Sequence, residues 1–193
     1  MAERSDEQLV SDYLDGDAVA FDFLVARYVP VLYRFLFRFV STSADAQDAT
    51  QETLVKIWKN IRRYDLKRPF KTWVFTVAKN TAIDLAKKKR PTALADFEDD
   101  DRSLADTIED ETPLPDRVVE NVLLAERLDA AIAGLPPKSK VAFLLHYDEG
   151  LTFREIAEIT GEALDTVKSR AFRAAKQLRA RLANHEDMHQ KPV

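Results

Sequence analysis

The chain ends in a sequence pattern that can bind zinc. Residues 185–189 read HEDMH, which fits H-E-x-x-H, where two histidines bind a metal and the glutamate acts as general base. A catalytic zinc site also needs burial, a third ligand and a substrate cleft. The remaining histidine, His146, lies in a stretch whose apolar spacing indicates packing. We therefore predict no catalytic and no metal site, and expect at most adventitious metal binding by an exposed tail.

Three carboxylates form a second candidate cluster, in the stretch DAQDATQETLVKIW. Asp45, Asp48 and Glu52 are spaced so that a helix would place them on one face, opposite Trp58 and with Gln51 beside them. Paired carboxylates can bind a metal or perform acid–base chemistry. No histidine converges on them in the sequence. Two interpretations remain, a solvated acidic face and a protein-binding face.

Basic side chains are concentrated in two stretches of the chain. Residues 56–90 carry 12 basic and 2 acidic side chains, and residues 165–183 carry 6 and 1. In the first stretch, basic residues are interleaved with aromatic ones, an arrangement that suits single-stranded nucleic acid because unstacked bases pack on flat rings. The spacing also allows Phe70 and Trp73 to be core residues, and the two roles are compatible. The interleaved aromatic residues are Tyr64, Phe70, Trp73 and Phe75.

The second basic stretch belongs to a predicted helix–turn–helix. Helices expected over 152–160 and 165–182 are joined by the turn GEAL, and Gly161 permits the left-handed conformation there. Basic and short polar groups on the second helix suit phosphates and base edges of duplex DNA. A solvated basic face is the alternative, although it leaves the turn and the helix cap unexplained. The stripe expected to face the core is Val167, Ala171, Ala174 and Leu178. The predicted outward residues are Lys168, Ser169, Arg170, Phe172, Arg173, Lys176 and Arg179.

The composition indicates a globular protein made of helices. Of 193 residues, 46% are hydrophobic and 32% charged, and helical apolar spacing recurs along most of the chain, so we predict an all-α fold. The 4 glycines lie too far apart for a phosphate-binding loop, and the lack of cysteine excludes disulfides and thiolate chemistry. No apolar run approaches 18 residues and no signal-peptide layout is present. We expect a cytoplasmic protein without membrane insertion.

A first helical domain is predicted over residues 1–91. Ser5 and Gln8 form a capping box for its first helix, and Asp17 starts a second helix in which Pro30 could introduce a kink or a break. The third helix, DAQDATQETLVKIWKNI, is expected to pack through Leu54, Ile57, Trp58 and Ile61. The fourth, from about residue 69 to 89, is expected to pack through Phe70, Trp73, Val74 and Val77.

An acidic linker is predicted over residues 92–117. This segment has few large apolar residues and many carboxylates. It cannot bury enough apolar surface to offset the loss of chain entropy on folding, so we expect it to be mostly disordered. It could be a solubilising spacer, or it could shield the two basic stretches, between which its negative charge lies.

A second helical domain is predicted over residues 118–184, followed by a flexible tail over 185–193. Apolar residues at helical spacing define its first helix, and Pro137 suits the first turn of the next. Thr152 with Glu155 forms a second capping box, and Asp165 is the expected cap of the last helix. The apolar residues of the first helix are Leu124, Leu128, Ile132 and Leu135.

Three blocks of this sequence resemble a known family. They are DAQDATQETLVKIW, FKTWVFTVAKNTAIDLAKK and LPPKSKVAFLLHYDEGLTFREIAEITGEALDTVKSRAFRAAKQL. They look like regions 2.2, 2.3–2.4 and 4 of bacterial sigma-70 factors, and the two-domain layout resembles the extracytoplasmic-function (ECF) group. The resemblance covers roughly residues 5–183. It implies a non-enzymatic protein without cofactors that binds core RNA polymerase, recognises −35 and −10 promoter elements and captures the melted strand.

The resemblance also implies a role for each surface and a set of partners. Region 2 would bind the coiled coil of the polymerase β′ subunit, region 4 would bind the β flap, and an anti-sigma factor would control the protein. The implied polymerase contacts are Asp45, Asp48, Gln51 and Glu52. The implied −10 contacts are Tyr64, Lys67, Arg68, Lys71, Trp73 and Asn80. The implied −35 contacts are Lys168, Ser169, Arg170, Phe172, Arg173 and Lys176.

Three departures from the family pattern stand out. Gln47 occupies a frequently acidic position, Glu162-Ala163 replaces a common apolar-proline turn, and Ala175 occupies a place that is often basic. A free-standing helix–turn–helix regulator is the main alternative to a sigma factor. Such a regulator would bind a duplex operator without polymerase, which would leave the block over residues 45–59 without a purpose.

Overall fold

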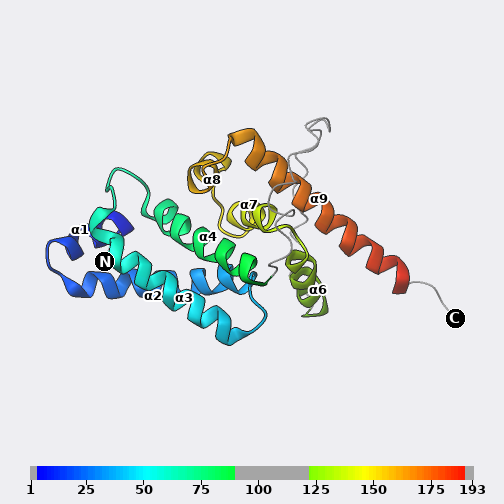
Figure 1. Cartoon of the computed structure of the whole chain (residues 1–193), viewed down its shortest axis with the longest axis horizontal. Coiled ribbons are helices and arrows are strands. Elements are labelled where there is room, and N and C mark those ends of the chain that lie inside the picture. Colours follow the sequence, from blue (N-terminus) through cyan, green and yellow to red (C-terminus); the bar gives the residue numbers. More distant parts are fainter. Residues whose placement is uncertain (1–3, 90–121, 190–193) are drawn as a thin grey trace. The chain divides into compact units, whose positions relative to one another are not determined.

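The computed structural model describes residues 4–89 and 122–189, with side chains described for 4–88 and 128–182 (Figure 1). The elements in these ranges are all helices, which confirms the predicted all-α fold. They form two compact units, one built from the helices before residue 90 and the other mainly from those after it. The predicted acidic linker over 92–117 lies outside the described residues.

The first unit begins with two helices whose starts are encoded locally. Its elements are α1 (Asp6–Leu14), α2 (Ala18–Phe37), α3 (Ser43–Asn60), the 3-10 turn η1 (Ile61–Arg63) and α4 (Phe70–Lys89). The capping box of α1 is present, because Ser5 Oγ accepts from Gln8 N at 3.2 Å and Gln8 Oε1 accepts from Ser5 N at 2.9 Å. Asp17 caps α2 by accepting from Val19 N at 3.0 Å. Pro30 lies within α2 without ending it, at an exposed position where water can replace the lost hydrogen bond.

The core of the first unit lies between α2, α3 and α4. Tyr28, Leu32 and Phe35 of α2 are buried, as are Phe70 and Phe75 of α4. Aromatic rings meet edge to face across the core, with Phe35 and Phe75 centroids 5.5 Å apart. Of the residues predicted to pack in α4, Phe70 and Val74 are buried, whereas Trp73 and Val77 are half-buried.

The predicted core stripe of α3 needs one correction. Trp58 was expected to face the core and is 53% exposed, whereas its neighbour Ile57 is buried. The buried stripe of α3 consists of Ile57 and four smaller residues before it. The smaller residues are Ala46, Ala49, Thr50 and Thr53. Small side chains let α3 pack closely, and Trp58 lies about 100° around the helix from Ile57, outside that contact.

The second unit contains four described helices that belong to the predicted region 4 segment. They are α6 (Val122–Ala133), α7 (Pro137–Tyr147), α8 (Phe153–Thr160) and α9 (Leu164–His189). Pro137 is in the first turn of α7, as predicted, and Gly161 has a φ of 73° in the turn before α9. The Thr152–Glu155 capping box is present, with Glu155 N donating to Thr152 Oγ1 at 3.3 Å and Thr152 N donating to Glu155 Oε2 at 2.8 Å.

The packing face of α9 was predicted correctly. Its stripe of Val167, Ala171, Ala174 and Leu178 is fully buried. In α6, Ile132 is buried too, while the side chain of Leu124 lies outside the described residues.

Both ends of α9 differ from the prediction. Asp165 is inside the first turn rather than at the cap position. Its negative charge in the first turn interacts favourably with the positive end of the helix dipole. At the other end the backbone of residues 185–189, expected to belong to a flexible tail, is helical. No glycine or proline occurs between Gly161 and Pro192 to end the helix earlier. The side chains of HEDMH lie outside the described residues.

Candidate nucleic-acid and polymerase-binding interfaces

Helix α3 presents an exposed face that is both acidic and apolar. Asp45, Asp48, Gln51 and Glu52 are all exposed, as predicted, and Thr42 anchors the helix start by accepting from Asp45 N at 3.1 Å. Glu52 forms an ion pair with Lys56 at 2.7 Å, and this hydrogen bond lowers the pKa of the Glu52 carboxyl.

Two apolar residues of this face were missed by the sequence analysis. Val55 is 47% exposed and Trp58 is 53% exposed. They lie four and seven residues after Gln51, so they share its side of the helix, and the prediction that Trp58 lies opposite the carboxylates was wrong. That spacing was a signal in the sequence. Exposed tryptophan is enriched at protein-binding surfaces, whose rims are polar.

The segment between α3 and α4, residues 61–69, is internally braced. Tyr64 is only 7% exposed, and its ring contacts Phe70 and Trp73 at centroid distances of 5.2 and 5.3 Å. Its hydroxyl donates to the Arg68 carbonyl, and Lys67 N donates to Asp65 Oδ1 at 3.0 Å. Burial, followed by the nearby Glu7 charge, raises the pKa of Tyr64 to about 12. Tyr64 was predicted as a DNA contact, but its ring packs inside the segment instead of being open to a base.

The other predicted −10 residues lie at the surface of the same unit. Lys67, Arg68 and Asn80 are exposed, while Lys71 and Trp73 are half-buried. Trp73 and Asn80 are seven residues apart on α4, so they occupy one face of that helix two turns apart. This face is long enough for single-stranded DNA to extend along it from the segment over residues 61–69 to Asn80.

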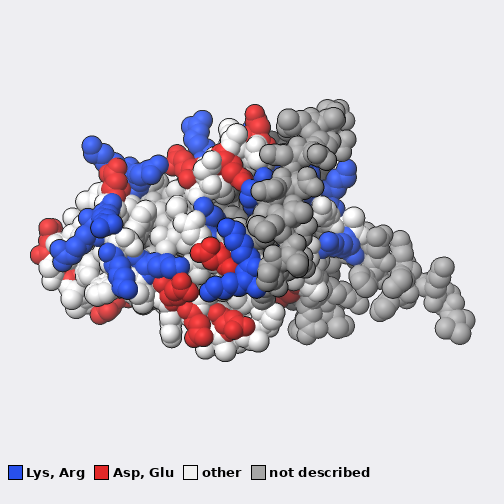
Figure 2. Space-filling model, in the orientation of Figure 1, with Lys and Arg blue, Asp and Glu red and all other residues white. Residues whose placement is uncertain are grey.

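Lysine and arginine are not the only charges on the first unit. Carboxylates are interspersed with them on the face shown in Figure 2, so the surface is not uniformly positive. The segment itself is net positive, because Arg62, Arg63, Lys67 and Arg68 are all exposed and Asp65 is its one carboxylate.

Helix α9 presents most of the predicted −35 residues. Lys168, Ser169, Phe172 and Arg173 are half-exposed and Lys176 is exposed. The Phe172 ring packs beside Phe153 of α8, with centroids 5.6 Å apart. These side chains therefore share the outward side of α9, in the arrangement expected of a recognition helix.

Arg170 is the exception on this helix. It is 4% exposed, and its Nε lies 3.5 Å from Glu162 Oε2 in the turn before α9. Position 170 is three residues after Val167 and four before Ala174, both buried, so it lies at the packed side of α9. The prediction that Arg170 faces outward was wrong. A charged side chain was expected at the surface, but the position of Arg170 along the helix places it on the packed side of α9.

Metal binding finds no support among the side chains that the structure describes. No group of three or more His, Cys, Asp or Glu side chains is placed to hold a metal there. The His146 ring stacks on Phe153 with centroids 4.0 Å apart, and Nδ1 lies 2.9 Å from the Leu151 carbonyl, which is the packing role expected for it. In the same ranges, no helix has the length and apolar character needed to cross a membrane.

Two family models match this chain, one before and one after the acidic stretch. Residues 24–92 match the family model of Sigma-70 region 2, and residues 125–178 match that of Sigma-70, region 4. The chain is 34% identical to the ECF RNA polymerase sigma-E factor of Haemophilus influenzae, across 92% of this chain and 96% of that protein. It is 31% identical to the ECF RNA polymerase sigma factor SigW of Bacillus subtilis, across 86% and 91%.

A solved structure extends the likeness to the fold. CnrH, determined in complex with the cytosolic domain of CnrY, superimposes with a TM-score of 0.69 at 25% identity, across 94% of this chain and 99% of CnrH. Sequence relatives that match along most of their length, together with both regional matches in one chain, establish the family. The chain belongs to the sigma-70 family of RNA polymerase sigma factors, in the ECF group.

Proposed function

We propose that this sigma factor binds core RNA polymerase, recognises the −35 and −10 elements of its promoters and captures the strand that melts. The observation that carries this proposal is the presence, in one chain, of region 2 and region 4 matches, each with its own exposed basic surface. The chemistry of RNA synthesis belongs to the polymerase, so the chain itself would not be an enzyme. Its place of action would be the cytoplasm.

Region 4 would recognise duplex DNA through α9. Lys168, Arg173 and Lys176 supply cations for phosphates or guanine edges, and Ser169 supplies a short polar group near the start of the helix. Phe172, held beside Phe153, offers an apolar edge that can contact a thymine methyl group. Arg170 would stabilise the helix–turn–helix from inside.

Region 2 would bind the opened strand of the −10 element. Removing a base from the duplex stack costs roughly a few kcal/mol, so the exposed base must be held once it is free. Lys67, Arg68 and Lys71 would bind phosphates, Trp73 would stack on a base, and the amide of Asn80 would bind a base edge. Tyr64 would act by bracing the segment rather than by contacting DNA.

The exposed face of α3 would bind the coiled coil of the polymerase β′ subunit. Its carboxylates Asp45, Asp48 and Glu52 favour a basic partner, Trp58 is of the residue type that often dominates binding energy, and Val55 adds apolar area beside it. Region 4 would contact the β flap. An anti-sigma factor would compete for these surfaces, and CnrH provides a related case in that it was solved with a bound protein domain.

Runoff transcription with core polymerase on a library of promoter sequences tests the proposal. We expect promoter-specific RNA only when the chain is added, together with enrichment of a −35 and a −10 sequence. A folded chain that does not bind core polymerase at micromolar concentration would contradict it. Tight binding of a duplex operator without polymerase would favour the free-standing regulator instead.

A further inference from the structure

Helix α4 begins without a side-chain cap of its own. Trp73 N donates to the Pro69 carbonyl at 3.3 Å, which makes Pro69 the residue preceding the first turn, and proline has no side-chain acceptor. The acceptor comes instead from the other end of the unit. Glu7 of α1, 63 residues away, accepts a hydrogen bond from Phe70 N through Oε1 at 3.0 Å. This bond is the largest cause of the lowered pKa of the Glu7 carboxyl.

The start of α1 is itself tied to a second helix. Asp6 accepts hydrogen bonds from the Tyr28 hydroxyl and from Arg27 Nη1, both on α2. Two adjacent carboxylates therefore join the start of α1 to α2 and to α4. We call Asp6 and Glu7 the N-terminal clasp.

Phe70 transmits the position of the clasp to the braced segment over residues 61–69. Its ring is 1% exposed and contacts Tyr28 and Tyr64 edge to face, with centroids 5.6 and 5.2 Å apart. Tyr64 in turn donates to the Arg68 carbonyl. The backbone that carries Lys67 and Arg68 is therefore connected to Glu7 through an unbroken series of contacts.

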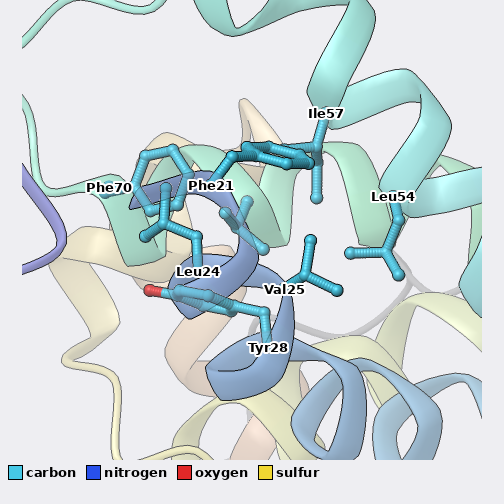
Figure 3. Close-up of a pocket in the computed structure, with 8 residues that line it drawn as sticks. Phe21, Leu24, Val25, Tyr28, Leu54, Ile57 and Phe70 are labelled. Atoms are coloured by element: carbon cyan, nitrogen blue, oxygen red, sulfur yellow. The ribbon is translucent and has the colours of Figure 1, made fainter. Parts of the chain in front are cut away.

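The ring of Phe70 is well packed in the core of the unit. It lies beside a small apolar pocket that side chains of α2, α3 and α4 surround (Figure 3). Besides Tyr28 and Tyr64 it contacts Trp73, with ring centroids 5.6 Å apart. Apolar packing therefore fixes the ring, and the hydrogen bond from Phe70 N to Glu7 fixes the backbone that carries it. The residues around the pocket are Phe21, Leu24, Val25, Tyr28, Leu54, Ile57, Phe70 and Val74.

We propose that Glu7 is a positioning residue for capture of the −10 strand: by capping α4 at Phe70 it fixes the segment that presents Lys67 and Arg68. The proposal rests on the proposed function of that segment. For a variant that lacks the Glu7 carboxylate, it predicts a change in nucleic-acid affinity opposite in sign to the change expected from charge alone. Removing a carboxylate near a basic surface should tighten nucleic-acid binding through charge alone, whereas loss of positioning should weaken it.

The test uses the full chain and a fluorescein-labelled single strand that carries the −10 sequence selected in the promoter-library experiment. We expect Glu7→Ala to weaken strand binding about five- to tenfold, which is less than the full effect of one charge-assisted hydrogen bond because only the positioning of the segment affects the strand. Glu7→Gln keeps an acceptor and should retain most of the affinity. Asp12→Ala is the matched control, because Asp12 is on the same helix but pairs with exposed Arg4 at 2.8 Å. It should leave strand binding unchanged or slightly tighter.

Affinity for core polymerase and the thermal midpoint are measured on the same samples. We expect core binding to be unchanged, because the face of α3 does not depend on Glu7. Equal or tighter strand binding by Glu7→Ala would overturn the inference, and so would parallel loss of strand and core binding, which would indicate general loss of the fold. Lys67→Ala and Asn80→Ala separate the two proposals. If these two variants leave strand binding unchanged as well, the proposed DNA-binding function of this surface is contradicted, and not only the role of Glu7.

Discussion

The two nucleic-acid surfaces of this sigma factor are built in different ways. In α9 the binding side chains project from one face of a single continuous helix, and neighbouring turns fix their spacing. In region 2 they project from the short segment over residues 61–69 and from α4 after it. The shape of that segment depends on contacts of Tyr64 and Phe70 and on the distant residue Glu7. The difference suits the two targets. A duplex offers a regular groove that matches a rigid helix, whereas a melted strand has no fixed shape and requires an irregular surface to hold it.

The largest expected effect comes from truncating one aromatic residue in each unit, the buried ring behind the region 2 surface and the half-exposed ring on the region 4 surface. Phe70→Ala should lower the free energy of unfolding of region 2 by about 3–5 kcal/mol, because a fully buried ring is lost, and strand capture should fail with it. Phe172→Ala should cost much less stability, because its ring is half-exposed, and should weaken −35 duplex binding instead. Denaturant unfolding and both binding assays check the pair. Similar stability losses would contradict the contrast between the surfaces.

The next effect separates two arginines of α9. Arg173→Ala should weaken duplex binding by about 1–3 kcal/mol if it contacts a base edge, or reduce the salt slope by about 1 if it contacts a phosphate. Arg170→Gln should lower the thermal midpoint without changing the salt slope, because Arg170 is buried beside Glu162. Fluorescence anisotropy on a −35 duplex across a salt series measures both. A reduced slope in the Arg170 variant would show that this side chain reaches DNA after all.

A smaller effect tests whether Tyr64 positions the segment or stacks on a base. Tyr64→Phe keeps the ring and removes the hydrogen bond to the Arg68 carbonyl, so strand binding should weaken by about 1 kcal/mol. Tyr33→Phe is the control, since the Tyr33 hydroxyl contacts Ser43 Oγ at 3.0 Å outside this segment. Absorbance during titration to alkaline pH follows deprotonation of the Tyr64 hydroxyl, whose pKa burial raises to about 12. Tyr64→Phe should lack this component. Full strand affinity in Tyr64→Phe would mean that the ring, and not the hydroxyl, carries the role.

The smallest effect is the pH dependence of the clasp. The pKa of Glu7 is lowered in the folded chain from its ordinary value of 4.5, chiefly by the hydrogen bond from Phe70 N. A lowered folded pKa means that the stabilisation is present above the ordinary value and is lost as pH falls through the folded one. The stability difference between the wild type and Glu7→Gln should therefore shrink below about pH 4.5. A difference that stays constant in acid would exclude an ionised Glu7 as its source.

Elements whose cause is local were predictable from the sequence. The capping boxes at Ser5–Gln8 and Thr152–Glu155 and the left-handed turn at Gly161 each depend on residues at most three positions apart. The packed stripe of α9 follows from the 3.6-residue period of a helix. The family resemblance rests on the same local blocks, which is why the function could be inferred from them.

Features that depend on which neighbour a helix meets were decided by the tertiary structure. Trp58 is exposed because small residues form the contact side of α3, and Arg170 is buried because its register adjoins the packed stripe of α9. Glu7 caps a helix 63 positions away, a relation for which no local spacing exists. The sequence by itself thus determined which segments are helical, apart from the ends of α9, and which family the chain resembles. Only the fold decided which side of each helix remains available for binding, because burial is a property of two surfaces in contact.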